Sequence, residues 1–265
     1  MRTLTGKTAG ETIAAVAVFG TVLAVAAMMT ARNGAGNGWV MPITFLASTG
    51  FVAVAVTRGA LGGRYGRFIL LGLAGCWCGD MLGPGSFLLG LGAFLLAHLG
   101  FIAAFCANGI AWRRVLWALP VLAFVHAPLL AWLLPQVSAG EFWPVTAYIA
   151  VISLMVLFAC GTSHNALGRR ALLGAILFFV SDIFVACWRY VETGPINGNF
   201  CYPVYYTACI VLAMSVSPPA KPVTASPEGC GGPVYRRPAA HSMDCTMTLR
   251  SSGGWVDAMS WPSAK

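Results

Sequence analysis

Hydrophobic residues fall into long continuous blocks along this chain, with short polar breaks between them. A hydrocarbon core some 30 Å thick is crossed by about 20 helical residues, which is close to the length of these blocks. A backbone exposed to lipid must satisfy its own hydrogen bonds, so each block is predicted to be helical. The blocks cover residues 12–30, 40–57, 68–83, 86–107, 115–134, 142–160, 171–188 and 200–216. The pattern therefore predicts an all-α polytopic membrane protein with about eight transmembrane helices.

The breaks between the blocks are rich in glycine, proline and asparagine, which favour turns. Gly83-Pro84-Gly85 directly follows a short third block and predicts a tight hairpin into the fourth. Beyond residue 216, prolines and glycines accumulate and the apolar periodicity ends. We expect residues 1–216 to form one eight-helix transmembrane domain and residues 217–265 to form a disordered cytoplasmic tail.

Composition supports the membrane assignment. Hydrophobic residues make up 58% of the 265 residues, and charged residues make up only 9%. Soluble domains carry roughly 25% charged residues, so this chain has too few to cover a water-exposed surface. A water-soluble protein is thereby excluded.

The distribution of lysine and arginine predicts the orientation. If eight helices alternate, fourteen of the sixteen basic residues fall on one side, and only Arg32 and Arg189 fall on the other. The positive-inside rule then places both termini in the cytoplasm. The first block has an apolar core of about 18 residues, longer than the 7–15 of a signal peptide, so we interpret it as a membrane helix. The net charge of +8 indicates contact with anionic lipid head groups at the cytoplasmic face, and the scattered basic residues do not indicate nucleic acid.

Two of the eight acidic residues, Asp80 and Asp182, lie within predicted membrane helices. A carboxylate there costs at least about 2.5 kcal/mol, which makes it a candidate for function. Asp80 lies 13 residues past Arg67, about 20 Å up a helix that rises from the cytoplasm. Asp182 lies 12 residues past Arg170, about 18 Å up. The two acids are predicted to be level, with His98 on the descending fourth helix slightly lower and within side-chain reach.

Helical spacing puts small and aromatic residues on the same faces as these groups. The shared positions are Gly90, Phe94 and Phe101 around His98, and Gly174 and Phe178 below Asp182. The alternative interpretation is that both aspartates are structural, each hydrogen-bonded to a serine, the backbone or an arginine. His126, beside Pro128 in the fifth block, is interpreted as a structural histidine of the core.

The nine cysteines do not suggest a disulfide framework or a metal site. Most lie inside apolar blocks, where thiols behave as small hydrophobic groups. Cys76-Trp77-Cys78 lacks the two intervening residues of a usual metal knuckle. The sequence contains no phosphate-binding glycine loop and no internal repeat, and it predicts no metal and no cofactor.

Four stretches stand in a distinctive order along residues 12–216: Gly79-Asp80, Phe87 to His98, Gly174 to Asp182, and Tyr205 to Ser215. Together with eight helices, they resemble the YhhN family of bacterial membrane proteins, to which the animal lysoplasmalogenases belong. The resemblance implies a multi-pass protein of the bacterial cytoplasmic (inner) membrane. Two positions depart from the family pattern, because Phe101 stands where the family usually has tyrosine and Cys209 where it usually has glutamine.

The resemblance implies hydrolysis of the vinyl ether bond of a lysoplasmalogen, or of a related lysophospholipid ether, within the bilayer. The products are a fatty aldehyde and a glycerophospho head group. Protonation of a vinyl ether gives an oxocarbenium ion that water traps, and this chemistry suits one carboxylic acid beside one carboxylate. On this interpretation Asp80, Asp182 and His98 are catalytic. The residues expected to bind substrate are Phe94, Phe101, Phe178, Ser181, Tyr205 and Cys209.

Two other functions fit a pair of intramembrane acids. Proton-coupled transporters use such pairs, but they often show inverted repeats and helices broken near mid-membrane. A non-catalytic lipid-binding membrane protein is the third hypothesis. Release of aldehyde by the purified protein, without a membrane gradient, distinguishes the enzyme from both.

Overall fold

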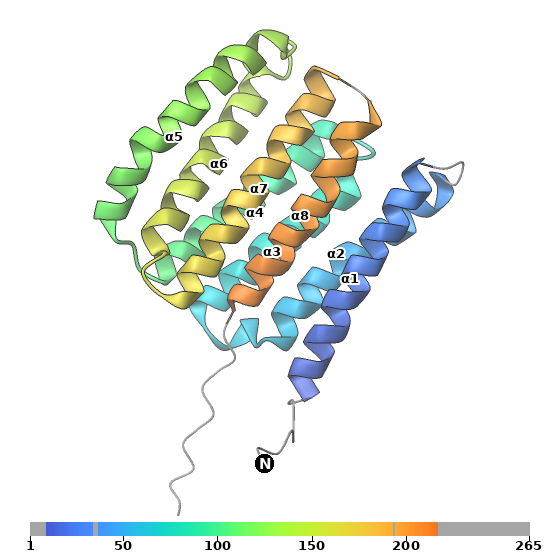
Figure 1. The fold of residues 1–265 in the computed structure, drawn as a ribbon, viewed down its shortest axis with the longest axis vertical. Helices are drawn as coiled ribbons and strands as arrows, with labels where there is room; N and C mark the ends of the chain where they lie inside the picture. The colour runs from blue at the N-terminus through green and yellow to red at the C-terminus, as the bar shows by residue number, and fades with distance from the viewer. Residues whose placement is uncertain (1–8, 34–36, 193, 217–265) are drawn as a thin grey trace, which may run out of the picture. The chain divides into compact units, whose positions relative to one another are not determined.

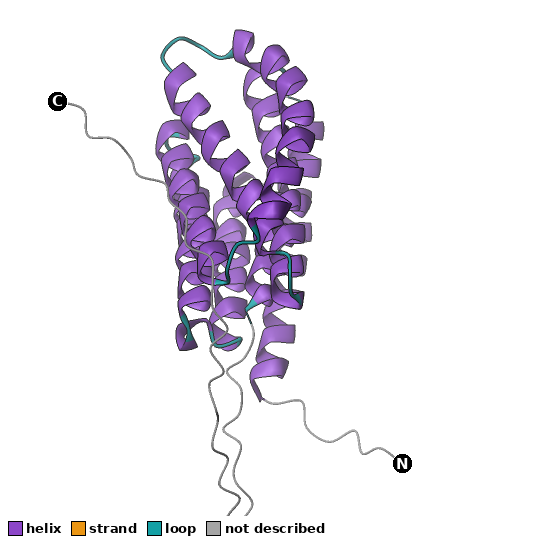
Figure 2. Ribbon diagram, turned by 90° about the vertical axis from the view of Figure 1, so that its left-hand side faces the viewer, coloured by secondary structure: helices purple, strands orange, loops and turns teal. Residues whose placement is uncertain are grey.

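The computed structural model describes residues 9–33, 37–192 and 194–216, and these form helices joined by short turns (Figure 2). The described residues form eight α-helices (Figure 1): α1 (Ala9–Asn33), α2 (Val40–Thr57), α3 (Arg64–Leu82), α4 (Phe87–Ala107), α5 (Trp112–Leu133), α6 (Phe142–Thr162), α7 (Ala166–Tyr190) and α8 (Pro195–Ser215). Short 3-10 helices lie in three connections, at Asn37–Trp39, Ala60–Gly62 and Leu134–Gln136. The prediction of eight helices is confirmed. The largest difference in a boundary is five residues, at the starts of α7 and α8.

The protein is a polytopic membrane protein. Six helices, α1, α2, α4, α5, α6 and α7, are long and apolar enough to cross a bilayer. Large hydrophobic residues are exposed on these helices: Phe124 is 82% exposed and Trp143 is 75% exposed. Such exposure is unfavourable in water and favourable in contact with lipid.

The remaining two helices, α3 and α8, have lengths similar to those of their neighbours but do not meet the same criterion of length and hydropathy. Helix α3 carries Arg64, Arg67 and Asp80. Helix α8 begins with Pro195-Ile196-Asn197-Gly198-Asn199 and contains several tyrosines.

Several helices that follow each other in sequence pack as antiparallel pairs. The most extensive contacts join α3 to α4, α7 to α8 and α1 to α2. Helix α4 also packs against α6, and α2 packs against α3 and α8. Helix α5 lies at the edge of the bundle beside α6 (Figure 1). The centre is filled by fully buried side chains, the largest being Tyr206, Phe51, Phe101, Phe105 and Phe178.

The predicted hairpin between α3 and α4 is confirmed. The backbone N–H groups of Gly85 and Ser86 both donate to the carbonyl of Leu82, at 3.1 and 2.9 Å. The hydroxyl of Ser86 accepts from the N–H of Leu89 and caps the start of α4. A Cβ at Gly90 would lie 2.7 Å from the Cα of Gly83, so only glycine allows the two backbones to come this close.

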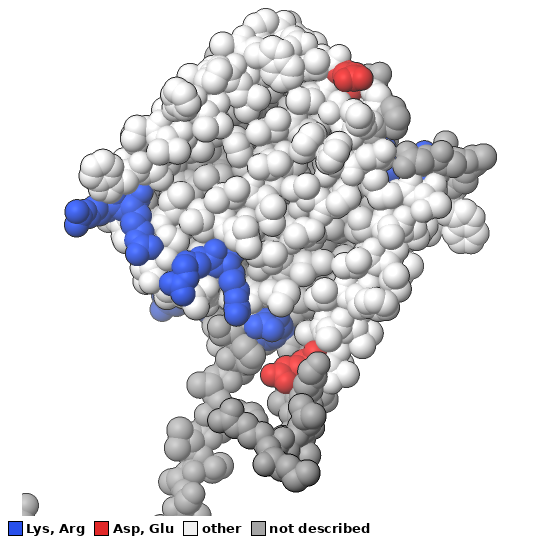
Figure 3. All heavy atoms as spheres, viewed as in Figure 1, with Lys and Arg blue, Asp and Glu red and all other residues white. Residues whose placement is uncertain are grey.

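Arginines gather at the end of the bundle where α8 finishes (Figure 3). Arg58 donates to the carbonyl of Val216 at 2.9 Å, and Arg170 donates to that of Met214 at 3.4 Å. We call this the arginine-rich end. The opposite end holds Arg32 and Arg189, close to the ends of α1 and α7. For the basic residues that the structure describes, the predicted separation is therefore present in the fold. The expected tail, 217–265, lies outside the described residues.

Candidate active site

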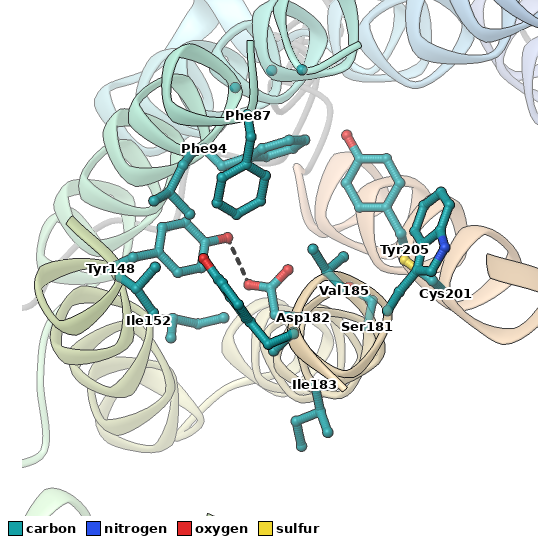
Figure 4. A pocket seen from close by; sticks show the side chains of 18 of the residues that line it. Phe87, Phe94, Tyr148, Ile152, Ser181, Asp182, Ile183, Val185, Cys201 and Tyr205 are labelled. Atoms are coloured by element: carbon teal, nitrogen blue, oxygen red, sulfur yellow. Dashed lines mark hydrogen bonds between the residues drawn. The ribbon is translucent and has the colours of Figure 1, made fainter. Parts of the chain in front are cut away.

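A cavity of about 660 Å³ occupies the half of the bundle nearer the end with few arginines. Its lining comes from the last turns of α1, α3, α5 and α7 and from the first turns of α2, α4, α6 and α8. Most lining side chains are apolar or aromatic (Figure 4). Asp80 and Asp182 are the acidic residues of the lining. The two acids, separated by 102 positions in the sequence, thus open onto one space, as their equal predicted depth implied.

Asp80 lies in the last turn of α3 and receives two hydroxyl hydrogen bonds on one carboxyl oxygen. Ser48 of α2 donates to Oδ2 at 2.5 Å, and Tyr205 of α8 donates to the same oxygen at 2.9 Å. The Ser48 hydroxyl is also 3.1 Å from that of Tyr206. Three helices are therefore joined at Asp80. Its Oδ1 makes no hydrogen bond with the residues that the structure describes, so this oxygen is available to a ligand.

Asp182 projects from α7 toward α6. Tyr148 of α6 donates to Asp182 Oδ2 at 2.7 Å, the interaction drawn in Figure 4. Neighbouring Ser181 also lines the cavity, but its hydroxyl is engaged by the carbonyl of Phe178 at 2.7 Å. The Asp182 side chain is 17% exposed. Within the described part of the chain, its Oδ1 too has no hydrogen-bond partner.

His98 lies beneath Asp182 and does not line the cavity. Its Nε2 is 3.9 Å from Asp182 Oδ2, and its side chain is fully buried. Neither ring nitrogen makes a hydrogen bond in the described structure. The ring lies 4.8 Å from that of Phe178 and 5.2 Å from that of Tyr148, measured between centroids. The predicted proximity of His98 to an acid is therefore present in the structure.

Aromatic rings connect the two acids beneath the cavity. The ring of Tyr205 lies 5.8 Å from Phe94 and 5.4 Å from Phe178, which in turn contacts His98. A Cβ at Gly79 would lie 2.6 Å from a ring carbon of Phe94, so this glycine makes room for Phe94 beside Asp80. The floor is therefore a packed aromatic layer that holds the carboxyl groups in place.

The six residues expected to bind substrate divide into two groups. Phe94, Ser181 and Tyr205 line the cavity. Phe101, Phe178 and Cys209 do not reach it, because they are fully buried in the layer below. The two departures from the family pattern, Phe101 and Cys209, thus alter the support of the site and leave its lining unchanged.

Sequence reasoning missed three polar residues of the site: Ser48, Tyr148 and Arg32. A hydroxyl gives no hydropathy signal in a membrane helix, so nothing marked Ser48 or Tyr148. His126 lines the cavity, but both ring nitrogens have partners, at the carbonyl of Leu122 (3.0 Å) and at the hydroxyl of Ser153 (2.8 Å). Its structural interpretation agrees with these contacts. Among the described residues, no three His, Cys, Asp or Glu side chains are grouped in a way that could hold a metal ion.

Comparison with known proteins gives relatives of modest similarity. A lysoplasmalogenase of Mycobacterium bovis is 33% identical over 110 residues, which are 40% of this chain and 41% of that protein. The lysoplasmalogenase TMEM86B of Rattus norvegicus is 30% identical over 163 residues, covering 59% of this chain and 64% of that protein. The lysoplasmalogenase TMEM86A of Bos taurus is 25% identical over 145 residues, covering 52% and 59%. The chain thus matches less than two thirds of the length of each relative. No solved structure matches it significantly.

The model of the YhhN family matches residues 40–216, which is more than half of the chain. The matched region begins with α2 and ends just after α8, so it includes both aspartates and every residue expected at the site. The match thus extends through seven of the described helices. The chain therefore belongs to the YhhN family.

Proposed function

We propose that this protein hydrolyses the vinyl ether bond of lysoplasmalogens, or of a closely related lysophospholipid ether, by acid–base catalysis. The observation that carries the proposal is the pair of carboxyl groups, Asp80 and Asp182, on one largely apolar cavity inside a membrane bundle. Relatives of this chain are named lysoplasmalogenases. The apolar lining of this cavity suits a lipid with one hydrocarbon chain.

The reaction requires one proton donor and one stabilising carboxylate. The donor protonates the outer carbon of the vinyl ether, and the adjacent carbon becomes part of an oxocarbenium ion. Water adds to that carbon and loses a proton to the carboxylate, and the resulting hemiacetal separates into aldehyde and alcohol. Asp80 and Asp182 each present an Oδ1 without a protein partner among the described residues, so either can take either role.

The surrounding residues suit a lipid substrate. One wall of the cavity consists of aliphatic side chains and provides a surface for the hydrocarbon chain. These side chains are Leu129, Leu130 and Leu133 of α5 and Ile149 and Ile152 of α6. Phe94 and Tyr205 lie beside Asp80 and limit the water that reaches the acids. His98 is a positioning residue for Asp182 in this proposal.

The proposed location is the bacterial cytoplasmic membrane, with both termini in the cytoplasm. The arginine-rich end then contacts anionic head groups of the inner leaflet, and the cavity lies in the outer half of the bundle. The substrate would enter from that half of the membrane.

The test is aldehyde release by the purified protein in detergent. Asp80→Asn and Asp182→Asn keep the side-chain shape but remove the titratable group, and each is expected to lower turnover about 10²- to 10⁴-fold. Because the two groups act as a unit, the double variant should be scarcely slower than either single one. His98→Gln is the graded control and should reduce turnover less than either aspartate variant.

Near-normal turnover per folded molecule in either single variant would contradict the mechanism in which Asp80 and Asp182 act together. Absence of aldehyde with every vinyl ether lysolipid, from a protein that still binds them, would point to the lipid-binding alternative. Hydrolysis in detergent needs no ion gradient, so transport cannot account for it.

A further inference from the structure

Arg32 is a cation on the wall of the cavity that holds the two aspartates. It lies in the last turn of α1, a helix outside the region that the family model matches. Its Nη1 donates to the Tyr202 hydroxyl at 3.1 Å. The guanidinium carbon lies 4.8 Å from the ring centroid of Trp188 and 4.6 Å from that of Tyr202. Two aromatic rings therefore fix the position of the charge.

The other arginine at this end of the bundle has a different environment. Arg189 donates to Glu141 at 2.7 Å, so its charge is neutralised by an acid of the protein. Among the described residues, no carboxylate lies within 4.0 Å of Arg32. A cation on an apolar wall is unfavourable unless something pairs with it. The site therefore suits an anionic group supplied by a ligand.

The Arg32 guanidinium lies farther from the arginine-rich end than Asp80 and Asp182 do. Tyr202, which contacts Arg32, precedes Tyr205, which contacts Asp80, by three residues on α8, a rise of about 4.5 Å. On α7, Trp188 follows Asp182 by six residues, a rise of about 9 Å. In a lysoplasmalogen, the three carbons of glycerol separate the vinyl ether from the phosphate, a span of the same order.

Helix α8 leaves space for the Arg32 side chain. A Cβ at Gly198 of α8 would lie 3.3 Å from Arg32 Nη2, closer than most side-chain contacts. Glycine here lets α8 pass beside the guanidinium without displacing it. The arginine is thus enclosed by two helices, α7 and α8, that also carry Asp182 and Tyr205.

We propose that Arg32 binds the phosphate of the lipid head group and so places the vinyl ether between Asp80 and Asp182. The inference rests on the proposed lysoplasmalogen hydrolysis and adds how the substrate is selected. A guanidinium offers several N–H donors in a planar fork that matches phosphate oxygens. The phosphate-bearing end of the lipid would lie toward the cavity mouth and the hydrocarbon chain along the leucines of α5.

The experiment compares two substrates on three proteins. The substrates are 1-alkenyl-glycerophosphocholine and 1-alkenyl-glycerol, which has the same vinyl ether but no phosphate. The proteins are the wild type, Arg32→Gln and Arg189→Gln, all assayed for aldehyde release in the same detergent. Arg32→Gln is expected to raise KM for the phospholipid about 10- to 100-fold and to leave KM for 1-alkenyl-glycerol within about twofold. Arg189→Gln should leave KM unchanged for both substrates. Equal effects of Arg32→Gln on both substrates would overturn the proposal.

A binding measurement separates this inference from the catalytic one. Thermal stabilisation by saturated lysophosphatidylcholine, which has no vinyl ether, should be lost in Arg32→Gln and retained in Arg189→Gln. If no aldehyde forms from any substrate but this difference persists, the phosphate site stands and the hydrolysis fails. If aldehyde forms and the difference is absent, the phosphate site fails alone.

Glycerophosphocholine and inorganic phosphate serve as competitors, and displacement by inorganic phosphate alone would identify a free-phosphate site and overturn the head-group proposal. Arg32→Lys keeps the charge and should recover part of the binding if the Gln variant folds poorly.

Discussion

Replacing Tyr205 by phenylalanine removes one of the two hydroxyl groups that donate to Asp80. The Tyr205 hydroxyl lies 2.9 Å from Asp80 Oδ2, and Ser48 donates to the same oxygen at 2.5 Å. The ring itself packs against Phe94 and Phe178, and phenylalanine preserves those contacts. Tyr205→Phe thus tests the polarity around the acid without opening a cavity.

The size of the loss depends on how the charge on Asp80 changes between the free enzyme and the transition state. A hydrogen bond to a charged group contributes about 1.5–3 kcal/mol, and one between neutral groups about 0.5–1.5 kcal/mol. If Asp80 is the proton donor, it gains negative charge in the transition state, so the hydrogen bond strengthens and its removal should lower kcat/KM about 5- to 10-fold. If Asp80 is ionised in both states, the hydrogen bond contributes about equally to both, and kcat/KM should change by about twofold or less. Tyr148→Phe applies the same test to Asp182. The variant with the larger loss therefore marks the proton donor.

The assay is aldehyde release per folded molecule, with the folded fraction taken from thermal unfolding. Tyr65→Phe is the matched control, because it removes a partly buried hydrogen bond between a tyrosine and Ser215 (2.6 Å) at the arginine-rich end. This control should lower stability without changing turnover. If Tyr205→Phe and Tyr148→Phe both behave like Tyr65→Phe, the hydroxyl groups do not act on the reaction and the reasoning is wrong.

Three further results are expected from the fold and the charge distribution. The hydrogen bond from Arg189 lowers the pKa of Glu141 from its ordinary value, so this pair stabilises the protein above the ordinary pKa, and its contribution is lost as pH falls through the lower, folded-state pKa. Glu141→Gln should therefore lower Tm slightly near neutral pH, and the difference should disappear once acid protonates Glu141; a difference that persists in acid would contradict this. Truncation at Pro218 should leave detergent-solubilised protein folded and active, by size-exclusion chromatography and aldehyde release; loss of both would mean that residues 217–265 belong to the domain. A reporter that is active only in the periplasm, fused after Ser215, should remain inactive because the C-terminus is predicted to be cytoplasmic. A strong signal would place this end in the periplasm and contradict the predicted topology.

The sequence predicted the helices well because membrane crossing imposes a simple length rule. Each block had to be about 20 residues long and helical, and all eight are present. The shared depth of Asp80 and Asp182 followed from rise per residue alone, since helices that start from one face reach equal heights after equal numbers of residues. The site was therefore predictable along the membrane normal.

Positions around each helix were harder to predict. A face shared by Phe94, His98 and Phe101 was apparent from spacing, but spacing does not say how far the cavity penetrates. Consequently Phe101 was expected to touch substrate, whereas it packs below the cavity floor. The partners of the acids, Ser48 and Tyr148, come from helices whose contacts with α3 and α7 depend on the tertiary packing. No local pattern could identify them.

The two helices that fall outside a simple membrane criterion, α3 and α8, meet at Asp80, where α2 also contributes Ser48. Helix α3 supplies the acid, and α8 supplies Tyr205 for it and Tyr202 for Arg32. Packing alone does not require these groups, because apolar residues of similar volume stabilise a buried site at least as well as charged ones. Their polarity is concentrated on one cavity, where hydroxyl donors reduce the cost of burying a carboxyl group. In the proposed reaction a proton is transferred inside the membrane, and hydroxyl groups that donate to Asp80 and Asp182 suit that transfer.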